Sequence, residues 1–104
     1  MADAELTGSV FVSAISLVEL FYLSEKGRIS DAVAAAVVSW IADDESAAEV
    51  VPVDFDLASR LATVSRDEVP DMPDRIIGAT ALHVGVSLVT RDSDLQRSAV
   101  PTIW

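Results

Sequence analysis

The stretch DMPDRIIGATALHVGVSLVTRDSD, residues 71–94, decides the fold of this chain. Pro73 suits the first turn of a helix, where its missing N–H leaves no hydrogen bond unmade. Asp74 follows, where the helix dipole favours negative charge. Residues 76–84 are almost all apolar, so this helix is expected to be mostly buried. Gly85 is expected to end the helix in the left-handed conformation.

A short buried strand, Val86–Thr90, and a polar loop, Arg91–Asp94, complete this stretch. In open α/β sheets ligands bind at the carboxyl ends of the strands. Asp92 therefore lies where a functional group is expected. Asp71 is more simply explained as a turn residue before the helix than as a ligand.

Strands alternate with helices in the rest of the chain. Strands are expected at 9–13, 50–53 and 100–104, and helices between Ser16 and Gly27, over 31–42 behind an N-cap at Ser30, and from Asp54 or Asp56 to about Ser65. This alternation predicts an α/β fold with a mainly parallel sheet and helices on both faces. Because there is neither a repeat nor a linker, residues 1–104 are expected to form a single domain.

The composition excludes several classes of protein. Apolar residues make up 51% of the 104 residues, yet the longest uncharged run, Ile76–Thr90, is shorter than the roughly 18 residues of a membrane span. The absence of cysteine excludes disulfides and thiolate metal sites. With no signal-like N-terminus either, a cytoplasmic protein without membrane contact is expected.

The net charge of −10, from 17 acidic and 7 basic residues, argues against a protein that passively binds nucleic acid. This net charge is compatible with a nuclease whose carboxylates bind divalent cations. It is also compatible with a protein that docks onto a basic partner.

Three carboxylates stand out by their context, because Glu19, Asp74 and Asp92 each follow a strand or open a helix beside apolar sequence. If they converge, two charges about 4 Å apart repel by about 4 kcal/mol at an effective dielectric constant near 20. Protonation or a divalent cation would relieve this repulsion. Mg²⁺ and Mn²⁺ prefer oxygen ligands, and such ions activate water and stabilise charge on a phosphodiester.

Three segments carry a family resemblance: VSAISLVEL at 12–20, DRIIGATALHVGVSLVTRD at 74–92, and the terminal TIW. They resemble the PIN domain of VapC-type toxins, which are metal-dependent ribonucleases of bacterial toxin–antitoxin pairs. The resemblance covers nearly the whole chain from Gly8 onward. It implies an RNA substrate, an antitoxin partner, a homodimer and a Mg²⁺ or Mn²⁺ cofactor.

The resemblance also assigns roles to individual residues. Glu19, Asp74 and Asp92 correspond to the family's catalytic, metal-binding acids, and Asp94 corresponds to an auxiliary metal-binding acid. Thr90 fits the small hydroxyl near the metal. Arg75 and Arg91 flank these acids. Either RNA phosphate or an acidic side chain is a suitable partner for each of them.

The chain departs from the family at its start. The family begins with an apolar strand ending in a metal-binding aspartate, and nothing similar precedes Ser9; neither Asp3 nor Glu5 ends an apolar strand. This loss predicts a gap between the strands at 10–13 and 86–90, and little or no nuclease activity. The start lies upstream, the copy is degenerate, or another chain fills the gap. The alternative function is a non-catalytic PIN-fold remnant that binds an antitoxin or another protein.

Each candidate also has a purely structural explanation. Asp74 suits any helix N-terminus, and Asp92 and Asp94 suit turns and caps. Glu19 has Lys26, Arg28 or Arg75 as candidate ion-pair partners. The single histidine, His83, is expected to pack on its helix, and the aromatic residues are candidates for the core or an interface: Phe11, Trp40 and Trp104.

Overall fold

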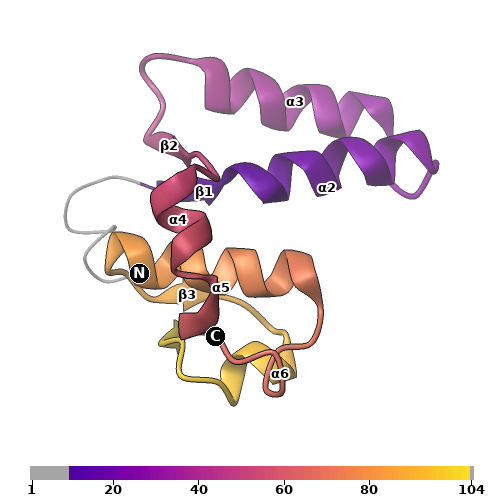
Figure 1. Cartoon of the computed structure of the whole chain (residues 1–104). Helices are drawn as coiled ribbons and strands as arrows, with labels where there is room; N and C mark the ends of the chain where they lie inside the picture. Colours follow the sequence, from indigo (N-terminus) through magenta and orange to yellow (C-terminus); the bar gives the residue numbers. More distant parts are fainter. Residues whose placement is uncertain (1–9, 104) are drawn as a thin grey trace.

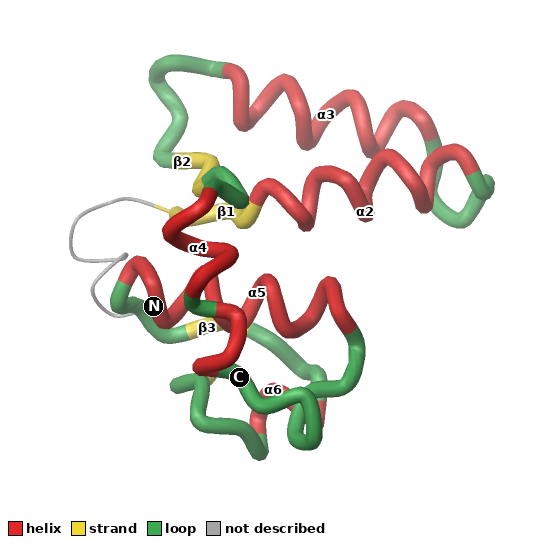
Figure 2. The backbone as a smooth tube through the Cα atoms, in the orientation of Figure 1, coloured by secondary structure: helices red, strands yellow, loops and turns green. Residues whose placement is uncertain are grey.

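The computed structural model describes residues 10–103 (Figures 1 and 2). Its elements in chain order are β1 (Val10–Ser13), α2 (Ala14–Glu25), α3 (Asp31–Ala42), β2 (Ala48–Val51), α4 (Phe55–Ser59), the 3₁₀ turn η1 (Leu61–Thr63), α5 (Met72–Val84), β3 (Leu88–Val89), α6 (Ser93–Gln96) and β4 (Thr102–Ile103). This order confirms the α/β class. The predictions for Asp3, Glu5, Ser9 and Trp104 lie outside the described residues.

The strands form two separate parallel pairs. In the first, Val10 of β1 lies opposite Ala48 of β2. In the second, Leu88 of β3 lies opposite Thr102 of β4. Within residues 10–103 no strand joins β1 to β3, and a groove lies between these two strands. Within the described residues the parallel sheet is therefore split at this point, while the loss of a first strand stays a prediction.

Side chains fix the starts of four described helices, α3, α4, α5 and α6. Ser30, Asp54 and Asp71 each accept a hydrogen bond from the backbone N–H three residues on. The N-cap predicted at Ser16 is wrong, because α2 begins at Ala14, directly after β1. Ser13 occupies the cap position, but its hydroxyl is hydrogen-bonded to that of Thr80 instead of capping the helix.

Several element bounds differ from those predicted. The helix expected to run to Ser65 ends at Ser59 and continues as η1, since Arg60 leaves helical geometry at ψ 2°. The second strand runs over 48–51, before Pro52, which has no N–H for a strand ladder. The strand expected at 86–90 contains only Leu88 and Val89. The loop expected at 91–94 opens α6, because the Asp92 carboxylate caps it.

The core surrounds the middle of α5, where residues 78–81 are buried. Its members are Leu57, Val64, Val69, Ala79, Ala81, Leu95 and Val100. Gly78 permits this packing, because a Cβ atom there would lie 3.1 Å from side-chain carbons of both Leu95 and Val100. Gly85 ends α5 at φ 83°, as predicted.

The hairpin of α2 and α3 extends from β1 and β2, with α2 alongside α5 and α3 on the far side of α2 (Figure 1). None of the residues of α2 is fully buried, and three aromatic side chains of the hairpin are exposed: Phe21, Tyr22 and Trp40. Trp40 is thus no core residue and stays a candidate for an interface. Within the described part of the chain, no helix is long and apolar enough to cross a membrane.

Candidate metal and nucleic-acid site

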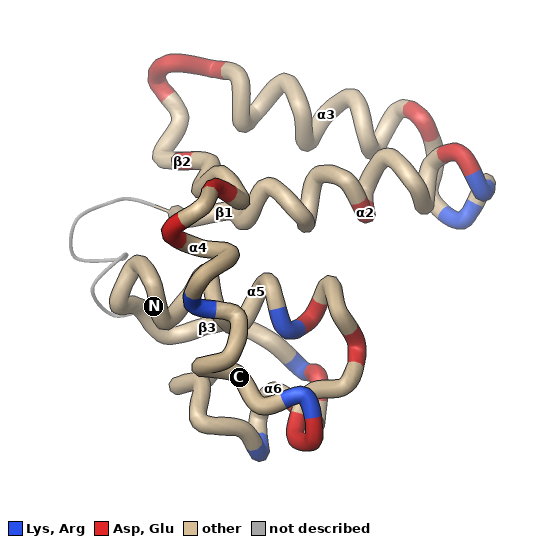
Figure 3. The backbone as a smooth tube through the Cα atoms, in the orientation of Figure 1, with Lys and Arg blue, Asp and Glu red and all other residues tan. Residues whose placement is uncertain are grey.

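Acidic side chains from three elements gather around the start of α5. Glu19 lies on α2, Asp71 and Asp74 lie at the N-terminus of α5, and Asp92 and Asp94 lie at the start of α6. Figure 3 shows acidic positions on α2, at the start of α5 and after β3 on the same side of the molecule. We refer to these five residues as the acidic cluster.

The pKa of Asp74 shows that the charges of the cluster interact with one another. Burial and then the charges of Asp71, Asp92, Glu19 and Asp94 raise the pKa of Asp74 from 3.8 to about 6. Burial, followed by the charge of Asp71, also raises the pKa of Glu19. The charges of Glu19 and Asp92 therefore both act on Asp74, while the metal-binding role of these three acids stays a prediction.

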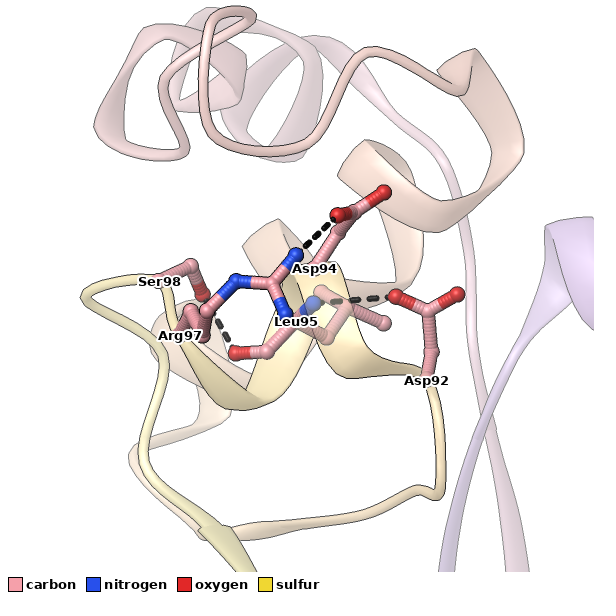
Figure 4. A network of polar contacts seen from close by, with 5 residues as sticks. All are labelled: Asp92, Asp94, Leu95, Arg97 and Ser98. Carbon is pink, nitrogen blue, oxygen red and sulfur yellow. Dashed lines mark hydrogen bonds and ion pairs between the residues drawn. The ribbon is translucent and has the colours of Figure 1, made fainter.

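Backbone N–H groups orient two of these carboxylates. Asp71 Oδ1 accepts from Asp74 N at 3.0 Å. Asp92 Oδ1 accepts from Leu95 N at 2.9 Å, as Figure 4 shows. Thr90 Oγ1 in turn accepts from Asp92 N at 3.0 Å, so the hydroxyl expected near the metal holds the loop that carries Asp92. Each of these caps uses one carboxylate oxygen, Oδ1.

Asp94 has an ion-pair partner on its own helix. Its Oδ1 accepts from Arg97 Nη2 at 2.8 Å (Figure 4). An exposed pair of this kind contributes little to stability. The pair nevertheless offsets part of the negative charge at α6.

The two flanking arginines differ in their surroundings. Arg75 donates from Nε to Val64 O at 3.1 Å and from Nη2 to Leu61 O at 3.3 Å. It thereby fastens α5 to η1 and to the loop after it, an arrangement that the sequence did not indicate. Arg91 is exposed beside Asp92. Within residues 10–103 Glu19 forms no ion pair with Lys26, Arg28 or Arg75, the partners considered in its structural explanation.

The donor set suits a hard divalent cation, because every side chain that contributes is a carboxylate or a hydroxyl. In the described part of the chain, however, no three acidic or histidine side chains are close enough to form a ligand group. Mg²⁺ commonly uses only one or two carboxylates and keeps several waters. The cluster therefore has the oxygen ligands that such an ion prefers, but it offers fewer direct ligands than the resemblance implies.

Sequence reasoning underestimated Asp71. It is the N-cap of α5, which agrees with its interpretation as a turn residue, but its charge also acts on both Glu19 and Asp74. Its position three residues before Asp74 was the available signal. His83 lies in the last turn of α5, away from the cluster, with Nδ1 buried and without a hydrogen-bond partner in the described structure.

Comparison with known proteins agrees with this fold. The family model described as "PIN domain" matches residues 1–101, so the chain belongs to the PIN-domain family. It is also 33% identical over 96 residues to Ribonuclease VapC22 of Mycobacterium tuberculosis, a match that covers 89% of this chain and 72% of that protein. The predicted VapC-type resemblance is thereby confirmed. No solved structure gives a significant match.

Proposed function

We propose that the chain is a ribonuclease toxin of the VapC type that cleaves RNA with a divalent cation bound among Glu19, Asp74 and Asp92, to one or two of these carboxylates directly and to the rest through water. The single observation that carries this proposal is the gathering of acidic side chains from α2, α5 and α6 around Asp74, whose pKa is raised by burial and by four neighbouring carboxylates. The ribonuclease activity named for the 33% identical relative supports the RNA substrate.

In the proposed mechanism the acidic cluster would hold Mg²⁺ or Mn²⁺, which when bound would lower the pKa of a water molecule and neutralise charge on the phosphodiester. Asp74, deprotonated above about pH 6, would be one of the residues that hold the ion. The hydrogen bonds from Leu95 N and to Thr90 Oγ1 fix the loop that presents Asp92. Arg91, exposed on that loop, contacts RNA phosphate. Asp94 is auxiliary, since Arg97 neutralises part of its charge.

The alternative proposal is a non-catalytic PIN-fold remnant that retains binding to a protein partner. The split between β1 and β3 favours it, as does the lack of a close group of three acids within residues 10–103. Both proposals include an antitoxin, for which the net charge of −10 suits a basic contact surface. Both also include a homodimer, supported by the exposed apolar side chains of the α2–α3 hairpin.

The experiment is cleavage of a fluorescent RNA with Mn²⁺, with and without EDTA. If the chain is a nuclease, Asp74→Asn and Glu19→Gln lower the rate by about a hundredfold or more, as expected for lost groups that act on a reacting water. The matched control Asp44→Asn, at an exposed turn, leaves the rate unchanged.

Cleavage that resists EDTA, or that Asp74→Asn leaves intact, contradicts the proposal. If the wild-type chain cuts no RNA but binds a partner equally well before and after Asp74→Asn, the non-catalytic alternative is favoured.

A further inference from the structure

Arg75 follows Asp74 directly, yet its guanidinium group is used in a different part of the molecule. Nε donates to Val64 O at 3.1 Å, and Nη2 donates to Leu61 O at 3.3 Å. Successive residues of an α-helix point about 100° apart, so Arg75 reaches η1 while Asp74 stays with the acidic cluster. Burial raises the pKa of Asp74, and the charges that add to this effect within residues 10–103 are all those of carboxylates.

The two carbonyl groups belong to a segment that the core holds in place. The side chains of Val64 and Val69 are fully buried and are members of the core. Between them the loop is closed by a hydrogen bond from Val69 N–H to Ser65 O at 2.9 Å. Buried apolar contacts of this kind make a segment locally stable. The core thus provides a fixed support to which Arg75 ties its own helix.

The first turn of α5 needs such a support. The first N–H groups of a helix have no partner within it, and helix ends fray. Asp71 Oδ1 accepts from Asp74 N, and Arg75 N–H donates to Asp71 O at 3.0 Å. Arg75 therefore closes the first turn with its backbone and ties that turn to η1 with its side chain. Repulsion among the carboxylates of the cluster pushes the same turn away from Glu19.

A guanidinium group suits this task better than an ammonium group. Arginine carries five N–H donors in a planar fork and can bind two fixed carbonyl oxygens at once. Lysine carries a point charge on a flexible stem, so it keeps the charge and loses the geometry. Lysine is nevertheless a common ligand of phosphate. The exchange of Arg75 for lysine therefore separates a positioning role from contact with RNA phosphate.

We propose that Arg75 is a positioning residue of the acidic cluster and not a contact for RNA. Its guanidinium group, fixed on two backbone carbonyls, holds the first turn of α5 against the repulsion of the cluster, so that Asp74 and Glu19 act on one cation. The proposal rests on the proposed function, because it takes the cluster to be the cation site. Groups that orient metal ligands typically contribute about ten- to a hundredfold to metal affinity.

The test compares Arg75→Lys and Arg75→Met with the wild-type chain. Arg66→Met is the matched control, because Arg66 is an exposed arginine on the loop that follows Val64. The first readout is the affinity for Mn²⁺ in the absence of RNA, from paramagnetic broadening of amide resonances at pH 7.5. Both Arg75 variants are expected to bind Mn²⁺ about tenfold more weakly, while Arg66→Met binds it as the wild type does.

The sign of the effect in Arg75→Met separates positioning from simple electrostatics. A positive charge repels a cation, so its loss alone would strengthen the binding of Mn²⁺. Positioning predicts weaker binding in this variant, and equally in Arg75→Lys, which keeps the charge. Circular dichroism checks that each variant folds, and Arg75→Lys keeps the test decisive if Arg75→Met does not fold.

A second readout does not depend on cation binding. In the metal-free chain, the amide resonances of Glu19 on α2 and of Asp92 at the start of α6 are expected to shift in Arg75→Lys, while those of α3 stay in place. In the RNA cleavage assay, kcat is expected to fall about tenfold, with the KM for RNA changed by less than about twofold.

Unchanged affinity for Mn²⁺ in Arg75→Lys overturns the proposal. A higher KM for RNA in Arg75→Met with kcat unaltered also overturns it, because Arg75 is then an RNA contact. If the wild-type chain binds no Mn²⁺, the proposed function fails, and the metal-free resonances decide on Arg75 alone. Shifted resonances of Glu19 and Asp92 in Arg75→Lys then support positioning, and unshifted ones overturn it.

Discussion

At the residue scale, the charge of Asp74 links the site to stability. Its pKa of about 6 in the folded chain lies above the ordinary value of 3.8, so folding favours the protonated form. This contribution to stability is complete below about pH 4 and is lost as the pH rises through 6. The ionised form of Asp74 thus lowers the free energy of unfolding, and perturbed groups of this kind are typical of functional sites.

Asp74→Asn is therefore expected to stabilise the chain at pH 7.5, by about 1 kcal/mol after allowance for solvent screening of a partly exposed group. The gain should vanish near pH 4. Urea denaturation at both pH values measures it, with Asp44→Asn as the control for loss of one exposed negative charge. A variant that is less stable than the wild type at pH 7.5 would show that the charge of Asp74 is stabilising.

Gly78 gives a second prediction at this scale. Alanine in the middle of a helix normally adds about 0.5–1 kcal/mol over glycine. At Gly78, however, the new methyl group would lie 3.1 Å from two buried side chains, Leu95 and Val100. We expect Gly78→Ala to lower the free energy of unfolding by about 1 kcal/mol, because the surrounding core is closely packed.

Thermal or urea denaturation of Gly78→Ala measures this effect, and Ala36→Gly on the exposed face of α3 calibrates helix propensity without a packing change. An increase in stability on Gly78→Ala would mean that Leu95 and Val100 move aside freely.

Local chemistry explains which residues could be identified from the sequence alone. A few neighbouring residues determine the roles of the caps Ser30 and Asp54 and of the left-handed Gly85, so the sequence predicted these roles. Glu19, Asp74 and Asp92 were recognised by context and family resemblance. The influence of Asp71 on Glu19 depends on how α2 lies against α5, which no local pattern contains.

At the scale of elements, a buried hydrogen bond connects β1 to α5. The hydroxyls of Thr80 and Ser13 lie 3.0 Å apart, and both residues are buried. Thr80 Oγ1 also lies 2.7 Å from Ile76 O. This contact places the carboxyl end of β1, and hence Glu19 on α2, relative to the start of α5.

Thr80→Val keeps the shape of the side chain and removes the hydroxyl, which leaves Ser13 without its partner. We expect a loss of about 1–2 kcal/mol in the free energy of unfolding. In the double variant Ser13→Ala/Thr80→Val part of this loss should be recovered. A double-mutant cycle by urea denaturation measures the coupling; fully additive losses would show that the two hydroxyls do not act together.

The sequence predicted the helices better than the strands, because helix ends depend on neighbouring residues. The bounds of α3 and α5 follow from caps and composition and agree with the prediction to within a residue. The length of a strand depends on a partner far away in sequence, so β2 shifted by two residues and β3 shrank to two. The break between α4 and η1 had no sequence signal, because Arg60 is an ordinary helix former.

At the scale of the whole molecule, the split sheet and the acidic cluster belong to one arrangement. The two parallel pairs flank a groove, and the acids lie beyond the carboxyl ends of the strands that border it. Family resemblance led to the predictions of a gap in the sheet and of an acidic site, whereas composition alone led to neither.

The central claim is that Glu19, Asp74 and Asp92 bind one divalent cation. Its most direct test is titration of the isotopically labelled chain with Mn²⁺, observed as paramagnetic broadening of amide resonances. The account expects broadening centred on Glu19, Asp74 and Asp92 at pH 7.5, reduced at pH 5 and lost in Asp74→Asn. Broadening confined to the exposed acids at 43–45, or unchanged by Asp74→Asn, would contradict it.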